Sequence, residues 1–133
     1  MARKLLVLAR EIGLALELTD IKVESLVPKS LRKLKSADDF LEKLKDYDKE
    51  FALTFAKAKN TGCVLRFVAK VEGEKASAKL EKVPTDSPLA LTRGADNIFT
   101  FYTKRYQRPL VIQGPGAGAE VTAGGVLADI LKI

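Results

Sequence analysis

Residues 114–129 read GPGAGAEVTAGGVLAD, a glycine-rich turn that runs directly into an apolar helical pattern. Gly114, Gly116 and Gly118 alternate with Pro115 and Ala117, and glycine permits positive φ angles and a close approach of a ligand to the backbone. A short apolar strand precedes the turn, and apolar residues at helical spacing follow it, namely Val126, Leu127, Ile130 and Leu131. The sequence therefore predicts a strand-to-helix junction.

Such a junction presents unpaired backbone N–H groups and the positive end of a helix dipole, which favour an anion, a phosphate or the polar edge of a cofactor. No lysine follows the glycines as in a P-loop, and their spacing differs from the dinucleotide fingerprint. Glu120 places a carboxylate near the first helical turn, where it disfavours a phosphate. The pattern favours a nicotinamide or ribose end. The alternative is a purely structural turn, with Gly124 and Gly125 allowing close packing of the last helix.

The beginning of the chain predicts a helix followed by a strand. The helix extends from residue 2 to about residue 14 and ends near Gly13. Its apolar face comprises Leu5, Leu8, Ala9 and Ile12. Residues 19–27 alternate between apolar and polar side chains, which predicts a strand that stops at Pro28.

A long helix is predicted next, from an N-cap at Ser36 to about Lys59. Asp38 and Asp39 lie in its first turn, where they complement the helix dipole. Much of the core is expected on its apolar face, which comprises Phe40, Leu44, Tyr47, Phe51 and Phe55. Asn60 and Gly62 end the helix.

The rest of the chain predicts mainly strands. The expected elements are a hairpin of about 63–72 and 75–83 with its turn at Glu72-Gly73-Glu74, a loop with one helical turn over 84–94, strands over 98–106 and 110–113, and a closing helix from about 121. This order predicts an α+β fold in which helices cover one face of a mostly antiparallel (mixed) sheet. We expect a single domain over residues 1–133. Self-association is expected to cover the other sheet face, because bare apolar sheets aggregate.

Composition excludes several kinds of site. The single Cys63 excludes an internal disulfide, and the chain has neither a signal peptide nor an apolar run of about 20 residues, so we expect the reducing cytoplasm and no membrane partner. Histidine is absent, which excludes a Ser-His-Asp triad, a histidine-based zinc site and a Cys/His pair within these residues. No metal site is expected.

The net charge of +6 raises the question of nucleic-acid binding. One basic cluster comprises Lys29, Arg32, Lys33 and Lys35, and a second comprises Lys104, Arg105 and Arg108 around Tyr106. Elsewhere lysines alternate with acidic residues, as on a solvated helix face. A nucleic-acid interface at the second cluster is therefore an alternative interpretation and not the leading one.

Two segments resemble homoserine dehydrogenases. Residues 114–129 are similar to the C-terminal end of that family, with its last strand, its GxGAGxxVTAxGV-type turn and its final helix, and NIFTFYTKRYQRPLVIQ (97–113) resembles the family's last strand pair. At the other end of the chain, ARKL (2–5) resembles the end of the DVARK motif. In that family the lysine of the motif gives and takes the proton on the substrate oxygen, which implies Lys4 as the catalytic residue.

The resemblance implies NAD(P)-dependent interconversion of L-aspartate semialdehyde and L-homoserine, a step of threonine and methionine biosynthesis, with NADP or NAD as the cofactor. It implies that Gly118 lies against the nicotinamide nucleotide, with Gly116, Ala117 and Ala119 as its neighbours. It also implies a homodimer formed through the sheet.

The aspartate that begins the motif, an upstream glutamate that binds the amino acid and the nucleotide-binding domain have no counterpart in these residues. We therefore expect the chain to be the C-terminal part of a longer enzyme, which either stands alone or is fused to an aspartokinase, and to be inactive by itself. The alternative from another class is a non-catalytic α+β interaction module that forms a dimer through its sheet.

Overall fold

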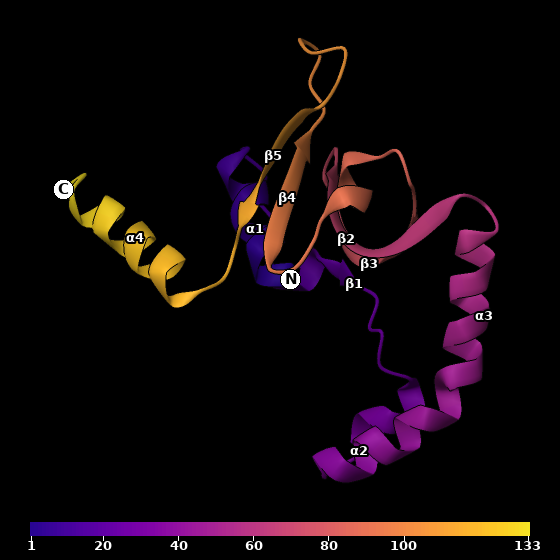
Figure 1. Cartoon of the computed structure of the whole chain (residues 1–133). Coiled ribbons are helices and arrows are strands. Elements are labelled where there is room, and N and C mark those ends of the chain that lie inside the picture. Colours follow the sequence, from indigo (N-terminus) through magenta and orange to yellow (C-terminus); the bar gives the residue numbers. More distant parts are fainter. The chain divides into compact units, whose positions relative to one another are not determined.

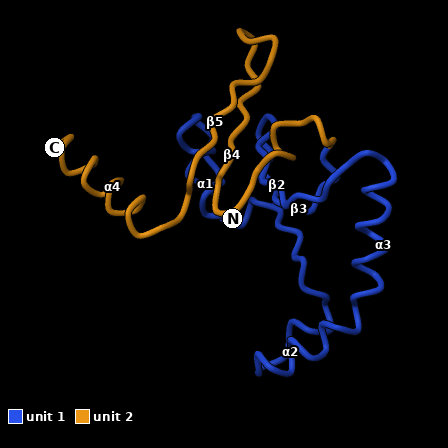
Figure 2. Tube along the Cα trace, viewed as in Figure 1, with its two compact units in different colours: residues 1–83 blue, residues 84–133 orange.

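A computed structural model describes all residues from 1 to 133, and the chain divides into two compact units. The first unit comprises residues 1–83 and the second comprises residues 84–133 (Figure 2). Helices and strands occur in both units, which confirms the predicted α+β class (Figure 1). The expected single domain over the whole chain stays a prediction.

The first unit contains three α-helices and one sheet. In chain order its elements are α1 (Ala2–Glu11), the 3₁₀ turn Leu18–Asp20, β1 (Lys22–Val23), the 3₁₀ turn Lys29–Lys33, α2 (Ala37–Leu44), the 3₁₀ turn Lys45–Tyr47, α3 (Asp48–Lys59), β2 (Cys63–Glu72) and β3 (Lys75–Pro84). The strand order is β1-β3-β2, and β1 runs parallel to β3. The predicted hairpin of β2 and β3 is confirmed, with Gly73 at a φ of 57° in its turn. Helices α1 and α3 both contact β2.

The core of the first unit is small and apolar. Leu5 of α1, Ile21 and Ala76 of β3 form its buried cluster. The half-buried residues Ala2, Leu6, Leu16, Ala69 and Val71 pack around them. Leu5 and Ala9 lie one helical turn apart and are both buried, so they hold one face of α1 against the sheet.

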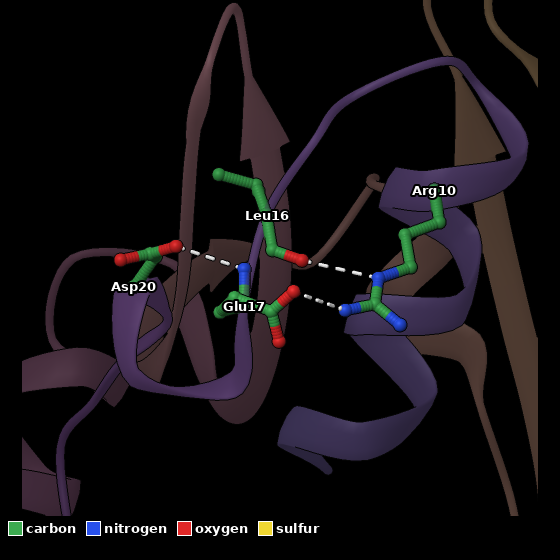
Figure 3. Close-up of polar contacts among 4 residues, drawn as sticks. All are labelled: Arg10, Leu16, Glu17 and Asp20. Atoms are coloured by element: carbon green, nitrogen blue, oxygen red, sulfur yellow. Dashed lines mark hydrogen bonds and ion pairs between the residues drawn. The ribbon is translucent and has the colours of Figure 1, made fainter.

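Polar contacts fasten the end of α1 to the segment that follows it (Figure 3). The Arg10 guanidinium donates to the Leu16 carbonyl oxygen over 3.1 Å and to the Glu17 carboxylate over 2.8 Å. The Glu17 backbone N–H in turn donates to the Asp20 carboxylate over 2.8 Å. These contacts fold the chain back after Gly13, which has a φ of 90°.

The strand predicted over residues 19–27 was largely wrong. Only Lys22–Val23 forms a strand, because the Glu17 and Asp20 side chains cap a 3₁₀ turn at its start. At its other end the Val27 N–H donates to the Ser25 hydroxyl over 3.2 Å, which replaces a strand contact by a local turn.

The single long helix predicted from Ser36 to Lys59 was also wrong. Its N-cap is confirmed, since the Ser36 hydroxyl accepts a bond from the Asp39 N–H, but the 3₁₀ turn Lys45–Tyr47 separates α2 from α3. A 3₁₀ turn has fewer residues per turn than an α-helix, so the apolar face rotates across it. Phe51 and Phe55 are 41% and 58% exposed, so the core expected on this face is absent there. Asn60 is the C-cap of α3, as predicted.

The second unit contains one hairpin and one helix. Its elements are the 3₁₀ turn Pro88–Leu91, β4 (Asp96–Phe101), β5 (Leu110–Pro115) and α4 (Ala119–Ile130). Strands β4 and β5 are antiparallel and form their own two-stranded sheet, so the strands of the chain make two sheets and not one. β4 ends at Phe101, earlier than predicted, because a local turn in which the Tyr106 N–H donates to the Thr103 hydroxyl follows it. No helix of the chain combines the length and the apolar character that a membrane-spanning segment needs.

Candidate functional site

The glycine-rich turn joins the end of β5 to the start of α4, as the sequence predicts. Gly118 is the N-cap of α4 and has a φ of 132°, a conformation that residues with a side chain rarely adopt. The Gly118 carbonyl oxygen accepts from both the backbone N–H and the hydroxyl of Thr122, over 3.0 and 2.9 Å. No side chain caps the helix, so its first N–H groups have no partner from a capping residue.

An open depression of about 820 Å³ lies over this turn and one side of α4. Its lining residues are Gly116, Ala117, Gly118, Ala119, Thr122, Ala123, Val126, Leu127 and Ile130. The four residues predicted to contact a cofactor are consecutive in the chain, and all of them line this depression. Small and apolar side chains line the depression beside uncapped backbone donors, so the backbone of the turn is open to a ligand. Glu120 is exposed in the first turn, where its charge disfavours a phosphate.

Gly116 is a glycine for a reason that sequence reasoning missed. A Cβ atom added to Gly116 would overlap the side chain of Asn97 in β4, whereas one added to Gly114 would meet no atom within 4 Å. Asn97 stands 19 positions before Gly116, and only the pairing of β4 with β5 brings the two together. Only the register of β4 against β5 would have identified Asn97 as a neighbour of Gly116.

The predicted catalytic residue Lys4 lies in the first unit, in the first turn of α1. Its side chain is exposed, and its neighbour Leu5 is buried in the core cluster. The four turn residues lie in the second unit. Lys4 and the predicted cofactor-binding residues therefore belong to different units.

Other candidate features are spread over the chain. Cys63 begins β2 as a free, half-buried thiol. No group of three or more acidic or cysteine side chains is arranged to hold a metal ion. The basic cluster Lys29–Lys35 belongs to the first unit, and the cluster Lys104–Arg108 lies between β4 and β5 in the second. Each basic cluster therefore belongs to a different unit.

The α+β fold of this chain ends in a glycine-rich turn before α4, and this turn is a candidate ligand-binding site. A family model described as homoserine dehydrogenase matches residues 1–131. The chain belongs to the homoserine dehydrogenase family.

Several individual proteins are similar to this chain. The chain is 49% identical over 135 residues to a chloroplastic bifunctional aspartokinase/homoserine dehydrogenase 2 of Zea mays, with 99% of this chain and 15% of the relative covered. It is 47% identical to the homoserine dehydrogenase of Saccharomyces cerevisiae, with 99% and 38% covered. A crystal structure of a Candida auris protein of unknown function is similar with a TM-score of 0.93 and 45% identity, and 98% of this chain and 37% of that chain are covered. The chain therefore spans well under half of each of these proteins.

Proposed function

We propose that this chain supplies part of the catalytic site of an enzyme that interconverts L-aspartate semialdehyde and L-homoserine. The match of the homoserine dehydrogenase family model to residues 1–131 is the observation that carries the proposal. The depression over the glycine turn supports it, because the turn presents uncapped backbone donors beside a mostly apolar lining.

Each part of the proposed site has a role. Gly116, Ala117, Gly118 and Ala119 bind the nicotinamide nucleotide through their backbone, since glycine and alanine leave room for close approach. The nicotinamide cofactor, NADP or NAD, supplies or accepts the hydride at the carbonyl carbon of the substrate. Lys4 gives or takes the proton on the substrate oxygen.

The test is an activity assay on the full-length protein that carries this sequence. L-homoserine with NADP or NAD in the oxidised form is expected to yield reduced nicotinamide, followed by its ultraviolet absorbance. Comparing the two cofactors decides which one the protein prefers. Absence of turnover with both cofactors, in a protein that remains folded, would favour the non-catalytic interaction module.

A homodimer through the sheet is the second part of the proposal. Cross-strand pairing places Phe99 opposite Ile112 and Phe101 opposite Leu110, so these four side chains share one face of the β4–β5 sheet. All four are between 36% and 53% exposed in the isolated chain. An apolar face of this kind favours burial against a second copy.

Replacing Ile112 by lysine is expected to shift the protein from dimer to monomer, because a charge would be buried at the centre of this face. Light scattering coupled to size-exclusion chromatography measures the change. Lys104→Gln, in the loop between the strands, is the control and should remain a dimer.

Raising the salt concentration should leave the dimer intact, whereas a complex of Lys104–Arg108 with nucleic acid would weaken steeply. A dimer that persists in Ile112→Lys would rule out this face.

The cytoplasm predicted from the sequence stays a prediction, and several relatives are named as chloroplastic proteins. Fractionation of the source cells, with detection of the full-length protein, measures it directly.

A further inference from the structure

Residues at the start of β4 contact the glycine-rich turn and support it. The Gly116 N–H donates to the Ala95 carbonyl oxygen over 3.1 Å, immediately before β4. Three residues before Gly116 and one residue after Ala95, the Gln113 amide donates to the Asp96 carboxylate over 3.1 Å. A backbone bond and a side-chain bond thus tie the end of β5 to the beginning of β4.

The side chain of Asn97 provides a further contact with this turn. It pairs directly with Gly114 in the antiparallel ladder, so its side chain lies on the same sheet face as residues 114 and 116. The side chain leans diagonally towards Gly116, since a Cβ built on Gly116 would overlap its Nδ2 and Cγ atoms. The missing side chain at position 116 therefore makes room for Asn97 and not only for a ligand.

The position of Asn97 relative to the depression defines its role. Gly116 lines the depression, and Asn97 does not. Asn97 is half-buried, and its side chain occupies the space where a Cβ atom of residue 116 would lie. Its amide thus supports the turn without contacting the space that a ligand would enter.

We propose that Asn97 is a positioning residue for the cofactor-binding turn, an inference that rests on the proposed function of that turn. By filling the space beside Gly116, Asn97 sets the height of residues 116–119 above the sheet, and with it the place of the uncapped N–H groups of α4. Binding geometry is sensitive to displacements of this kind, because hydrogen-bond donors misplaced by about 1 Å lose much of their effect.

A double-substitution cycle in the full-length protein tests the contact. Gly116→Ala is expected to raise the Kd of the nicotinamide cofactor by about tenfold or more, because the added methyl group displaces the turn from Asn97. Asn97→Ala removes both overlapping atoms, so the double variant Asn97→Ala/Gly116→Ala is expected to bind several-fold more tightly than Gly116→Ala alone. Cofactor binding is measured by the fluorescence of the reduced nicotinamide.

The matched control is Gly114→Ala. It adds the same methyl group two positions earlier on the same sheet face, where no atom lies within 4 Å, and should leave the cofactor Kd within about twofold. A general loss of stability would affect both alanine substitutions, whereas displacement by Asn97 affects only Gly116→Ala.

Hydrogen exchange of the residue 116 amide gives a readout that needs no cofactor. Asn97→Ala and Gly116→Ala should each speed this exchange, since each loosens the bond to the Ala95 carbonyl. In the double variant the exchange should be no faster than in Gly116→Ala. Additive effects of the two substitutions on exchange would overturn the assignment of Asn97. Absence of cofactor binding by the unsubstituted protein, with coupled exchange effects, would overturn the proposed function instead.

Discussion

Replacing Lys4 by methionine is expected to lower kcat of the full-length enzyme by about 10²–10⁴-fold, the usual contribution of a positioned general acid–base group. Methionine keeps much of the length of the lysine side chain and removes only the group that transfers the proton. The Kd of the nicotinamide cofactor should change much less than kcat, because the proposed cofactor contacts are backbone groups of residues 116–119. Steady-state kinetics and cofactor titration measure the two quantities separately.

Arg3→Met is the matched control for Lys4→Met. Arg3 is the preceding residue of α1, it is also exposed and basic, and its replacement removes the same charge from the same helical turn. Its kcat should stay within about threefold of the unsubstituted enzyme, as expected for a surface substitution. Equal losses in the two variants would show that the charge of the helix matters and that Lys4 has no specific role in proton transfer.

Replacing Leu5 by alanine is expected to lower the free energy of unfolding by about 2–5 kcal/mol, the range for truncating a buried leucine. Leu5 is only 5% exposed and packs with Ile21 and Ala76, which come from distant parts of the chain. The truncation would leave a cavity where α1 meets the sheet. Urea unfolding followed by circular dichroism measures the change.

Val7→Ala on the same helix controls for helix propensity in that experiment. Val7 is 59% exposed, so its truncation removes little buried surface and should change the free energy of unfolding by less than about 0.5 kcal/mol. A similar loss in both variants would contradict the core position of Leu5. Because Leu5 follows Lys4 directly, the same anchor also holds the first turn of α1 in place.

Local sequence signals predicted the elements whose geometry depends on nearby residues. The β2–β3 hairpin follows from the glycine between two runs of strand-forming residues. The N-cap at Ser36 follows from its hydroxyl, which accepts a hydrogen bond from the backbone N–H three residues later, at Asp39. The turn before α4 follows from the need for a positive φ at Gly118. Each of these signals is contained within a few residues.

Periodicity failed where a few residues interrupted it. The pattern of Phe40, Leu44, Tyr47, Phe51 and Phe55 assumes one continuous helix, and the 3₁₀ turn Lys45–Tyr47 breaks that assumption. At this turn the Tyr47 hydroxyl lies 2.6 Å from the hydroxyl of Ser30, a residue 17 positions earlier. A pattern read along the chain contains no information on such a partner.

The sequence alone determined the family of this protein, the α+β class and the glycine turn with its four small residues, because motifs and backbone requirements are local. Tertiary structure alone decided that Asn97 supports Gly116, that Phe99 and Ile112 share an apolar face, and that Leu5, Ile21 and Ala76 meet in one core. Those relations join residues far apart in the chain. These relations depend on strand register and on side-chain packing. Both form only when the chain folds and its apolar side chains leave water.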